Sequence, residues 1–128
     1  MTNTTPIPAD PNSLNYQMLK EFLETVNASE DNFANFKAAG HLPLTIEKEY
    51  TDNGLPVYSM AWWTTQAGEY MCAPAMRIKV DAAAGTVEPL TFDNDLTGAC
   101  LEEDEDGHLS KYLLQWLTEI KYCGYTAK

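Results

Sequence analysis

The chain has 128 residues and a mass of 14.3 kDa, and 45% of its residues are hydrophobic, which is enough for one domain with a hydrophobic core. This composition excludes wholesale disorder. Nineteen acidic residues against eight basic ones give a formal net charge of −11. Such a charge argues strongly against direct binding to nucleic acid, and it excludes docking on an anionic membrane.

Residues 1–12 are polar and contain Pro6, Pro8 and Pro11, which predicts a flexible arm in front of a single domain over residues 13–128. The arm has neither the basic start nor the apolar core of a signal peptide, and no segment approaches the roughly 18 apolar residues of a membrane span. The three cysteines lack the paired spacing of disulfide or zinc sites. We therefore expect a cytoplasmic protein without a metal or cofactor.

The first elements are predicted to be helical. Apolar residues recur every four positions over about 14–26, behind Ser13 as a candidate N-cap. Asn27 or Ser29 could cap a second short helix, which would carry Phe33 and Phe36 three residues apart and end near Gly40.

The pattern then changes to the alternation of strands. A first strand is expected from Leu42, followed by a hairpin turn at residues 52–54. Further strands are expected over 57–65, about 70–81 and 86–92, with a bulge or edge position at Pro74 because proline cannot donate to the ladder. Residues 93–108 are predicted to be an acidic loop.

A final helix is predicted from Leu109 to just before Gly124. The expected fold class is α+β: an antiparallel four-stranded sheet with two N-terminal helices and one C-terminal helix, packed on one face.

The acidic residues are concentrated in one stretch of the chain. Between Lys79 and Lys111 there is no lysine or arginine. The acidic residues of this stretch are Asp81, Glu88, Asp93, Asp95, Glu102, Glu103, Asp104, Glu105 and Asp106. Residues 102–107 resemble the start of a calcium-binding loop, but the twelfth position, which should supply a bidentate glutamate, is Leu113. A solvated loop and a partner-binding surface remain as alternatives.

Aromatic residues offer a second candidate surface. In a strand over 57–65, Trp62 and Trp63 point to opposite faces, so one belongs to the core and the other can be exposed. Tyr58 lies on the face of Trp62, and we expect these two side chains to be partner-binding residues, because tyrosine and tryptophan favour interface cores. The alternative is that a helix covers this side as well.

No catalytic motif stands out. A Cys–His pair of His41 or His108 with Cys72 or Cys100 has no local support, and no glycine-rich phosphate loop is present. The chain is therefore not expected to be an enzyme. A small enzyme or ligand-binding domain that uses the Gln66–Met76 region remains an alternative, as does a non-catalytic accessory subunit.

The segment from Gly40 to Phe92 carries a family resemblance. Its motifs are GHLPLTI at 40–46, YSMA at 58–61, QAGE at 66–69, APAMRIKV at 73–80 and EPLTF at 88–92. They resemble a family of small bacterial domains of unknown function carried on plasmids and conjugative elements. Members of that family have an acid before the proline of the fourth motif, where this chain has Ala73. The resemblance implies a mobile-element origin and an α+β fold, and it implies no reaction.

Charge and resemblance together predict a protein that acts by binding. A basic groove built for phosphates also attracts clustered carboxylates. We therefore expect a monomer or homodimer that binds a basic nucleic-acid-binding protein of the host and inhibits it by nucleic-acid mimicry, as anti-CRISPR or antirestriction proteins do. The partner-binding residues would be the nine acids named above with Tyr58 and Trp62.

Overall fold

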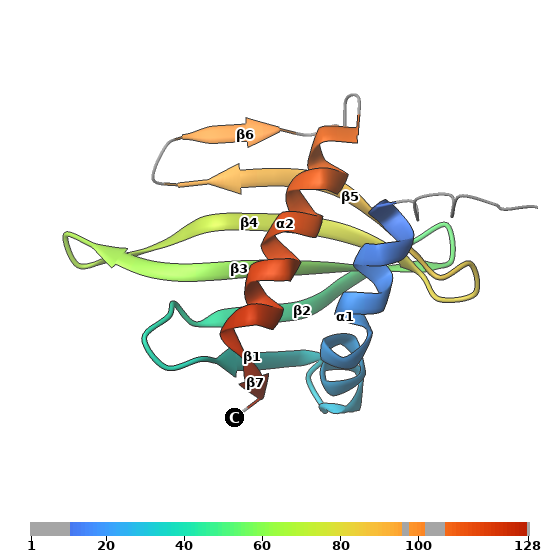
Figure 1. Cartoon of the computed structure of the whole chain (residues 1–128), viewed down its shortest axis with the longest axis horizontal. Coiled ribbons are helices and arrows are strands. Elements are labelled where there is room, and N and C mark those ends of the chain that lie inside the picture. Colours follow the sequence, from blue (N-terminus) through green and yellow to red (C-terminus); the bar gives the residue numbers. More distant parts are fainter. Residues whose placement is uncertain (1–10, 96–97, 102–106, 128) are drawn as a thin grey trace, which may run out of the picture.

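The computed structural model describes residues 11–95, 98–101 and 107–127. In this part of the chain two helices lie in front of one large antiparallel sheet (Figure 1). The helices are α1 (Pro11–Ala28) and α2 (His108–Cys123). The strands are β1 (Phe33–Lys37), β2 (Leu44–Asp52), β3 (Leu55–Gln66), β4 (Glu69–Asp81), β5 (Thr86–Asn94), β6 (Ala99–Leu101) and β7 (Thr126–Ala127).

The seven strands are ordered β6-β5-β4-β3-β2-β1-β7, so strands β1 to β6 form a meander and the C-terminal β7 pairs with β1. The predicted turn between β2 and β3 is present: Asn53 and Gly54 have φ of 52° and 82°, which is the left-handed geometry that an Asn-Gly hairpin supplies. Short hairpins explain the neighbour-to-neighbour order, because a tight turn joins only antiparallel strands.

The sheet buries one face against both helices, and we call this the inner face. From α1, the side chains of Leu19, Phe22 and Val26 reach it, and the ring of Phe22 meets that of Phe36 on β1 edge to face at 4.8 Å. The predicted stripe of α2 is also buried, and the helix ends at Gly124, whose φ of 77° closes it. Among the described residues, neither helix combines the length and apolarity needed to cross a membrane.

The predicted fold class is wrong in its count of elements: the sheet has seven strands rather than four, and the described part of the chain has one N-terminal helix rather than two. Residues 33–37 form β1 instead of a helix. The chain turns at Asn32 (φ 54°), and Phe36 then faces inward while Asn35 and Lys37 face out. Pairing with β2 on a buried face thus outweighs a helix-like spacing of two phenylalanines.

Other boundaries also differ from the expectation. Helix α1 begins at Pro11, so Ser13 lies inside the helix and is not its N-cap; proline is well suited to a first turn, where its missing N–H has no helical partner. Residues 93–108 are not one loop, since β5 continues to Asn94 and pairs with β6. The bulge expected at Pro74 is confirmed by the shift in register that places Ala61 opposite Ala75 but Trp63 opposite Cys72.

Candidate acidic binding face

The sheet face turned away from α1 and α2 is here called the outer face, and no described helix lies over it (Figure 1). Directly paired residues of antiparallel strands point to the same side. One outer row therefore runs across four strands as Glu47, Ser59, Arg77 and Thr91. The row next to it is Thr45, Ala61, Ala75 and Asp93, and a third is Tyr50, Val57, Lys79 and Glu88.

Acidic side chains outnumber basic ones on the outer face of β2 to β5. The acids are Glu47, Glu49, Asp52, Glu88 and Asp93, and the bases are Arg77 and Lys79. Both bases are already held in ion pairs. Nε of Arg77 lies 2.7 Å from Oε1 of Glu49, and Nζ of Lys79 lies 3.2 Å from Oδ2 of Asp52.

The negative electrostatic potential of this face affects the pKa of Arg77. The hydrogen bond to Glu49 and the charge of that carboxylate raise the pKa of Arg77 above its ordinary value, and Asp93 contributes further negative charge. Arg77 is therefore a fixed cation that balances part of the acidic face. The remaining carboxylates leave an excess of negative charge there, which attracts cations of a partner.

The structure brings some of the predicted acids together and separates others. Glu88 and Asp93 share the outer face, opposite Lys79 and Ala75. Asp81 closes its own turn by accepting a hydrogen bond from the backbone N–H of Ala84 at 3.0 Å, and Asp95 follows the end of β5. The other five predicted acids, at positions 102–106, lie outside the described residues, as does most of the calcium-like segment.

The two aromatic residues of the predicted binding surface, Tyr58 and Trp62, lie on the inner face of the sheet. Tyr58 is 2% exposed, and its hydroxyl reaches α1; Trp62 faces inward too, against α2. Trp63 lies on the outer face instead, where its Nε1 donates to Oγ1 of Thr45 at 2.8 Å. Tyr50, at the other end of this face, is 49% exposed. The sequence contained a signal for this outcome, because Tyr58 and Met60 are larger than the alternating residues Val57, Ser59 and Ala61.

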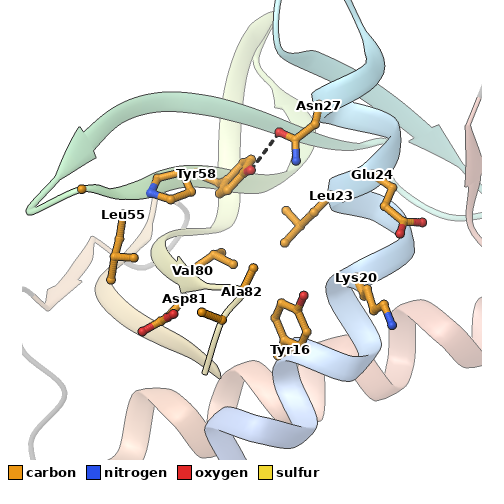
Figure 2. A pocket seen from close by; sticks show the side chains of 13 residues that line it. Tyr16, Lys20, Leu23, Glu24, Asn27, Leu55, Tyr58, Val80, Asp81 and Ala82 are labelled. Atoms are coloured by element: carbon orange, nitrogen blue, oxygen red, sulfur yellow. Dashed lines mark hydrogen bonds between the residues drawn. The ribbon is translucent and has the colours of Figure 1, made fainter. Parts of the chain in front are cut away.

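A groove lies on the opposite side of the molecule, between α1 and two hairpin turns (Figure 2). Its cavity of about 390 Å³ is lined on α1 by Tyr16, Lys20 and Glu24, and on the turns by residues 54–56 and 81–83. At one side, Tyr58 donates a hydrogen bond of 2.9 Å to Oδ1 of Asn27. Lys20 lines this groove together with two acids, Glu24 and Asp81.

Aromatic side chains also surround a recess between α2, β3 and the loop before β2. Trp62 packs edge to face on Trp116 at 5.4 Å and parallel to Tyr125 at 6.4 Å between ring centroids. Two cavities, of about 160 and 440 Å³, share Trp62 and Glu119 in their walls. Burial raises the pKa of Tyr112 and of Tyr125, and the negative charge of Glu119 raises both further.

The described residues give limited support for a nucleophilic or metal-dependent site. His41 lies 3.8 Å from Sγ of Cys123, a pairing that the sequence did not indicate, whereas Cys100 is exposed on β6. The described residues contain no group of three or more histidine, cysteine or acidic side chains that could hold a metal ion. The Gln66–Met76 region forms the β3–β4 hairpin and the first part of β4, and the four cavities described in this part of the chain are lined by other residues.

Comparison with known families gives one match: the model of the family described as Domain of unknown function (DUF6908) covers residues 17–126. That span begins within α1, includes strands β1 to β6 and α2, and ends at the first residue of β7. No curated protein and no solved structure matches the chain.

Proposed function

We propose that this chain, a member of the DUF6908 family, acts by binding a basic protein surface and inhibits a host nucleic-acid-binding protein of a defence system. The observation that supports this proposal is the charge of the outer face of the sheet. On β2 to β5 its acidic side chains exceed its basic ones, and the two bases on this face, Arg77 and Lys79, are engaged in ion pairs. A mobile-element origin, as the sequence resemblance implies, is part of this proposal.

The proposed mechanism is competition for a phosphate-binding groove. Carboxylates spaced along neighbouring strands present negative charge to the lysine and arginine side chains that otherwise contact nucleic acid. Steering by the net charge of −11 speeds the encounter and makes it sensitive to salt. Tyr50 and Trp63, at opposite ends of the outer face, supply the aromatic contacts that interface cores favour.

The test uses two variants of equal net charge. The outer-face variant carries Glu47→Gln, Glu88→Gln and Asp93→Asn, none of which belongs to a described ion pair. The control variant carries Glu24→Gln, Glu30→Gln and Glu69→Gln, three exposed positions away from that face. A third variant, in which residues 102–106 are changed to serine, tests the remaining predicted acids.

Each protein is immobilised, and a bacterial lysate is passed over it at low and at high salt. We expect wild type and control to capture a basic nucleic-acid-binding protein that high salt releases, and the outer-face variant to lose it. The purified partner must then lose affinity for DNA or RNA when wild type is added. Equal capture by the outer-face variant, or unchanged nucleic-acid affinity of the partner, would contradict the proposal.

A further inference from the structure

A second candidate binding site lies on the inner side of the fold, away from the outer face. It is the aromatic recess around Trp62, Tyr112, Trp116, Glu119 and Tyr125, which joins α2 to β3 and to the C-terminal segment. We propose that this recess binds the guanidinium group of an arginine side chain presented by a protein partner. The site is distinct from the outer face and does not depend on the function proposed for that face.

The first argument is the arrangement of the aromatic rings. Trp62 is held by two neighbours, edge to face on Trp116 and parallel to Tyr125, so its orientation is fixed before any ligand arrives. Tyr112 is held in the same way by Phe92, with ring centroids 4.9 Å apart. Fixed aromatic faces attract cations, and arginine is the side chain that most often stacks on them.

The second argument is the place of Glu119. It lines both cavities, and none of the three ion pairs found among the described residues includes it. Its negative charge lies close enough to Tyr112 and Tyr125 to raise the pKa of both phenols, after the larger effect of burial. A guanidinium group in the recess would meet a carboxylate and aromatic faces together, a combination that favours a cation over a neutral group.

The third argument is size and access. The larger cavity measures about 440 Å³ and opens beside His41 and Leu42, both of which are exposed. The smaller cavity, of about 160 Å³, is lined by Gln115 and Trp116 and shares Trp62 and Glu119 with the larger one. One extended side chain can therefore enter from the loop and place its charged end next to Glu119.

The test is a titration followed by NMR of the indole N–H groups at pH 8, above the range in which histidine side chains protonate. The probe is N-acetyl-argininamide, which mimics an arginine within a chain. Its uncharged isostere N-acetyl-citrullinamide, N-acetyl-lysinamide and free arginine are titrated in parallel. The indole of Trp63 on the outer face, bonded to Thr45, is the internal control and is assigned with Trp63→Phe.

We expect saturable shifts of the Trp62 and Trp116 signals with N-acetyl-argininamide, and an unmoved Trp63 signal. Glu119→Gln should weaken binding roughly tenfold, because the probe loses its charged partner. Gln115→Glu adds a second carboxylate to the smaller cavity and should tighten binding. Glu24→Gln, in the groove beside α1, should leave the affinity unchanged.

Several results would overturn the inference. Absence of saturation would show that the recess does not bind the probe. Equal binding of the citrulline probe, or unchanged affinity in a folded Glu119→Gln protein, would show that the carboxylate does not contribute to binding. Lysine binding as tightly as arginine would remove the preference for a guanidinium group. Tighter binding of free arginine than of the amide would make the recess a small-molecule site rather than a contact for a protein side chain.

Discussion

The hydroxyl of Tyr58, in the middle of the sheet, donates a hydrogen bond of 2.9 Å to Oδ1 of Asn27 near the end of α1 (Figure 2). The ring of Tyr58 is buried, whereas Asn27 is exposed. One side chain thus contributes to the core with its ring and fixes the helix with its hydroxyl. The same contact explains why Tyr58 does not serve as a surface residue.

Replacement of Tyr58 by phenylalanine should remove only this bond. We expect the free energy of unfolding to fall by about 1 kcal/mol, because Asn27 can turn to solvent and leaves no buried polar group unsatisfied. Denaturant unfolding measures the change. Tyr58→Ala is the matched comparison and should cost about 3–5 kcal/mol through loss of the ring. Equal losses in the two variants would show that the ring contributes little beyond the hydroxyl.

The start of α1 is tied to the start of α2 by Asn15 and Ser110. Asn15 is fully buried, and its Nδ2 donates to the backbone carbonyl of Ser110 at 3.1 Å. Asn15→Asp keeps the shape but replaces the donor by a carboxylate. At pH 7 we expect the free energy of unfolding to fall by at least about 2 kcal/mol, since the charge is buried without a partner.

The cost of Asn15→Asp should depend on pH in a defined direction. Burial raises the pKa of the new carboxyl, so the folded state holds its proton longer than the unfolded state does. The destabilisation is therefore small below about pH 4 and grows as the pH rises. Asn12→Asp is the control, because Asn12 is half-buried in the first turn of α1, where negative charge is favourable. A pH-independent cost at Asn15 would contradict the argument.

The local sequence pattern predicted those helices and strands whose hydrophobic periodicity lies within one continuous segment. The alternation over β2 to β5 and the apolar stripe of α2 belong to long elements with one buried face, and both were found. The spacing of Phe33 and Phe36 is compatible with a helix, and no local signal indicates a strand. These residues form a strand only because they pair with β2. Strands β6 and β7, of three and two residues, are too short to carry a pattern.

The candidate binding sites depend even more on contacts between residues that are far apart in the sequence. Trp62 and Glu119 come from β3 and α2, and their meeting in one recess follows from the packing of that helix across the sheet. In contrast, the outer face follows from strand period and register. Glu88 and Asp93 were recognised from composition, but Glu47 and Glu49 join them only because β2 and β5 lie on either side of β3 and β4.

The β3–β4 hairpin contains a residue that strains its turn. Ala67 has φ 54° and is followed by Gly68 at φ 84°. The left-handed conformation is unfavourable for alanine, because its Cβ atom comes too close to the following carbonyl oxygen. Asparagine tolerates this region far better. We expect Ala67→Asn to raise the free energy of unfolding by about 0.5–1 kcal/mol in a denaturant titration. Ala83→Asn, in the exposed β4–β5 turn without positive φ, should give no gain.

The C-terminal segment is fixed by Tyr125, whose hydroxyl donates to the backbone carbonyl of Leu42 at 2.5 Å. Burial raises the pKa of Tyr125, with further contributions from negative charge at Cys123 and Glu119. The folded state therefore keeps the phenol proton at a pH where the unfolded state releases it. The stabilisation is complete below the unfolded pKa of about 10 and is lost as the pH rises through the folded value.

Tyr125→Phe should accordingly flatten the loss of stability above pH 10. The difference in slope between wild type and variant cannot exceed about 1.4 kcal/mol per pH unit, which is the limit for one proton. Thermal or denaturant unfolding between pH 8 and pH 11 measures it. Tyr122→Phe, at a side chain 92% exposed near the end of α2, is the matched control variant. Identical slopes for wild type and Tyr125→Phe would show that the phenol of Tyr125 titrates alike in the folded and unfolded chain.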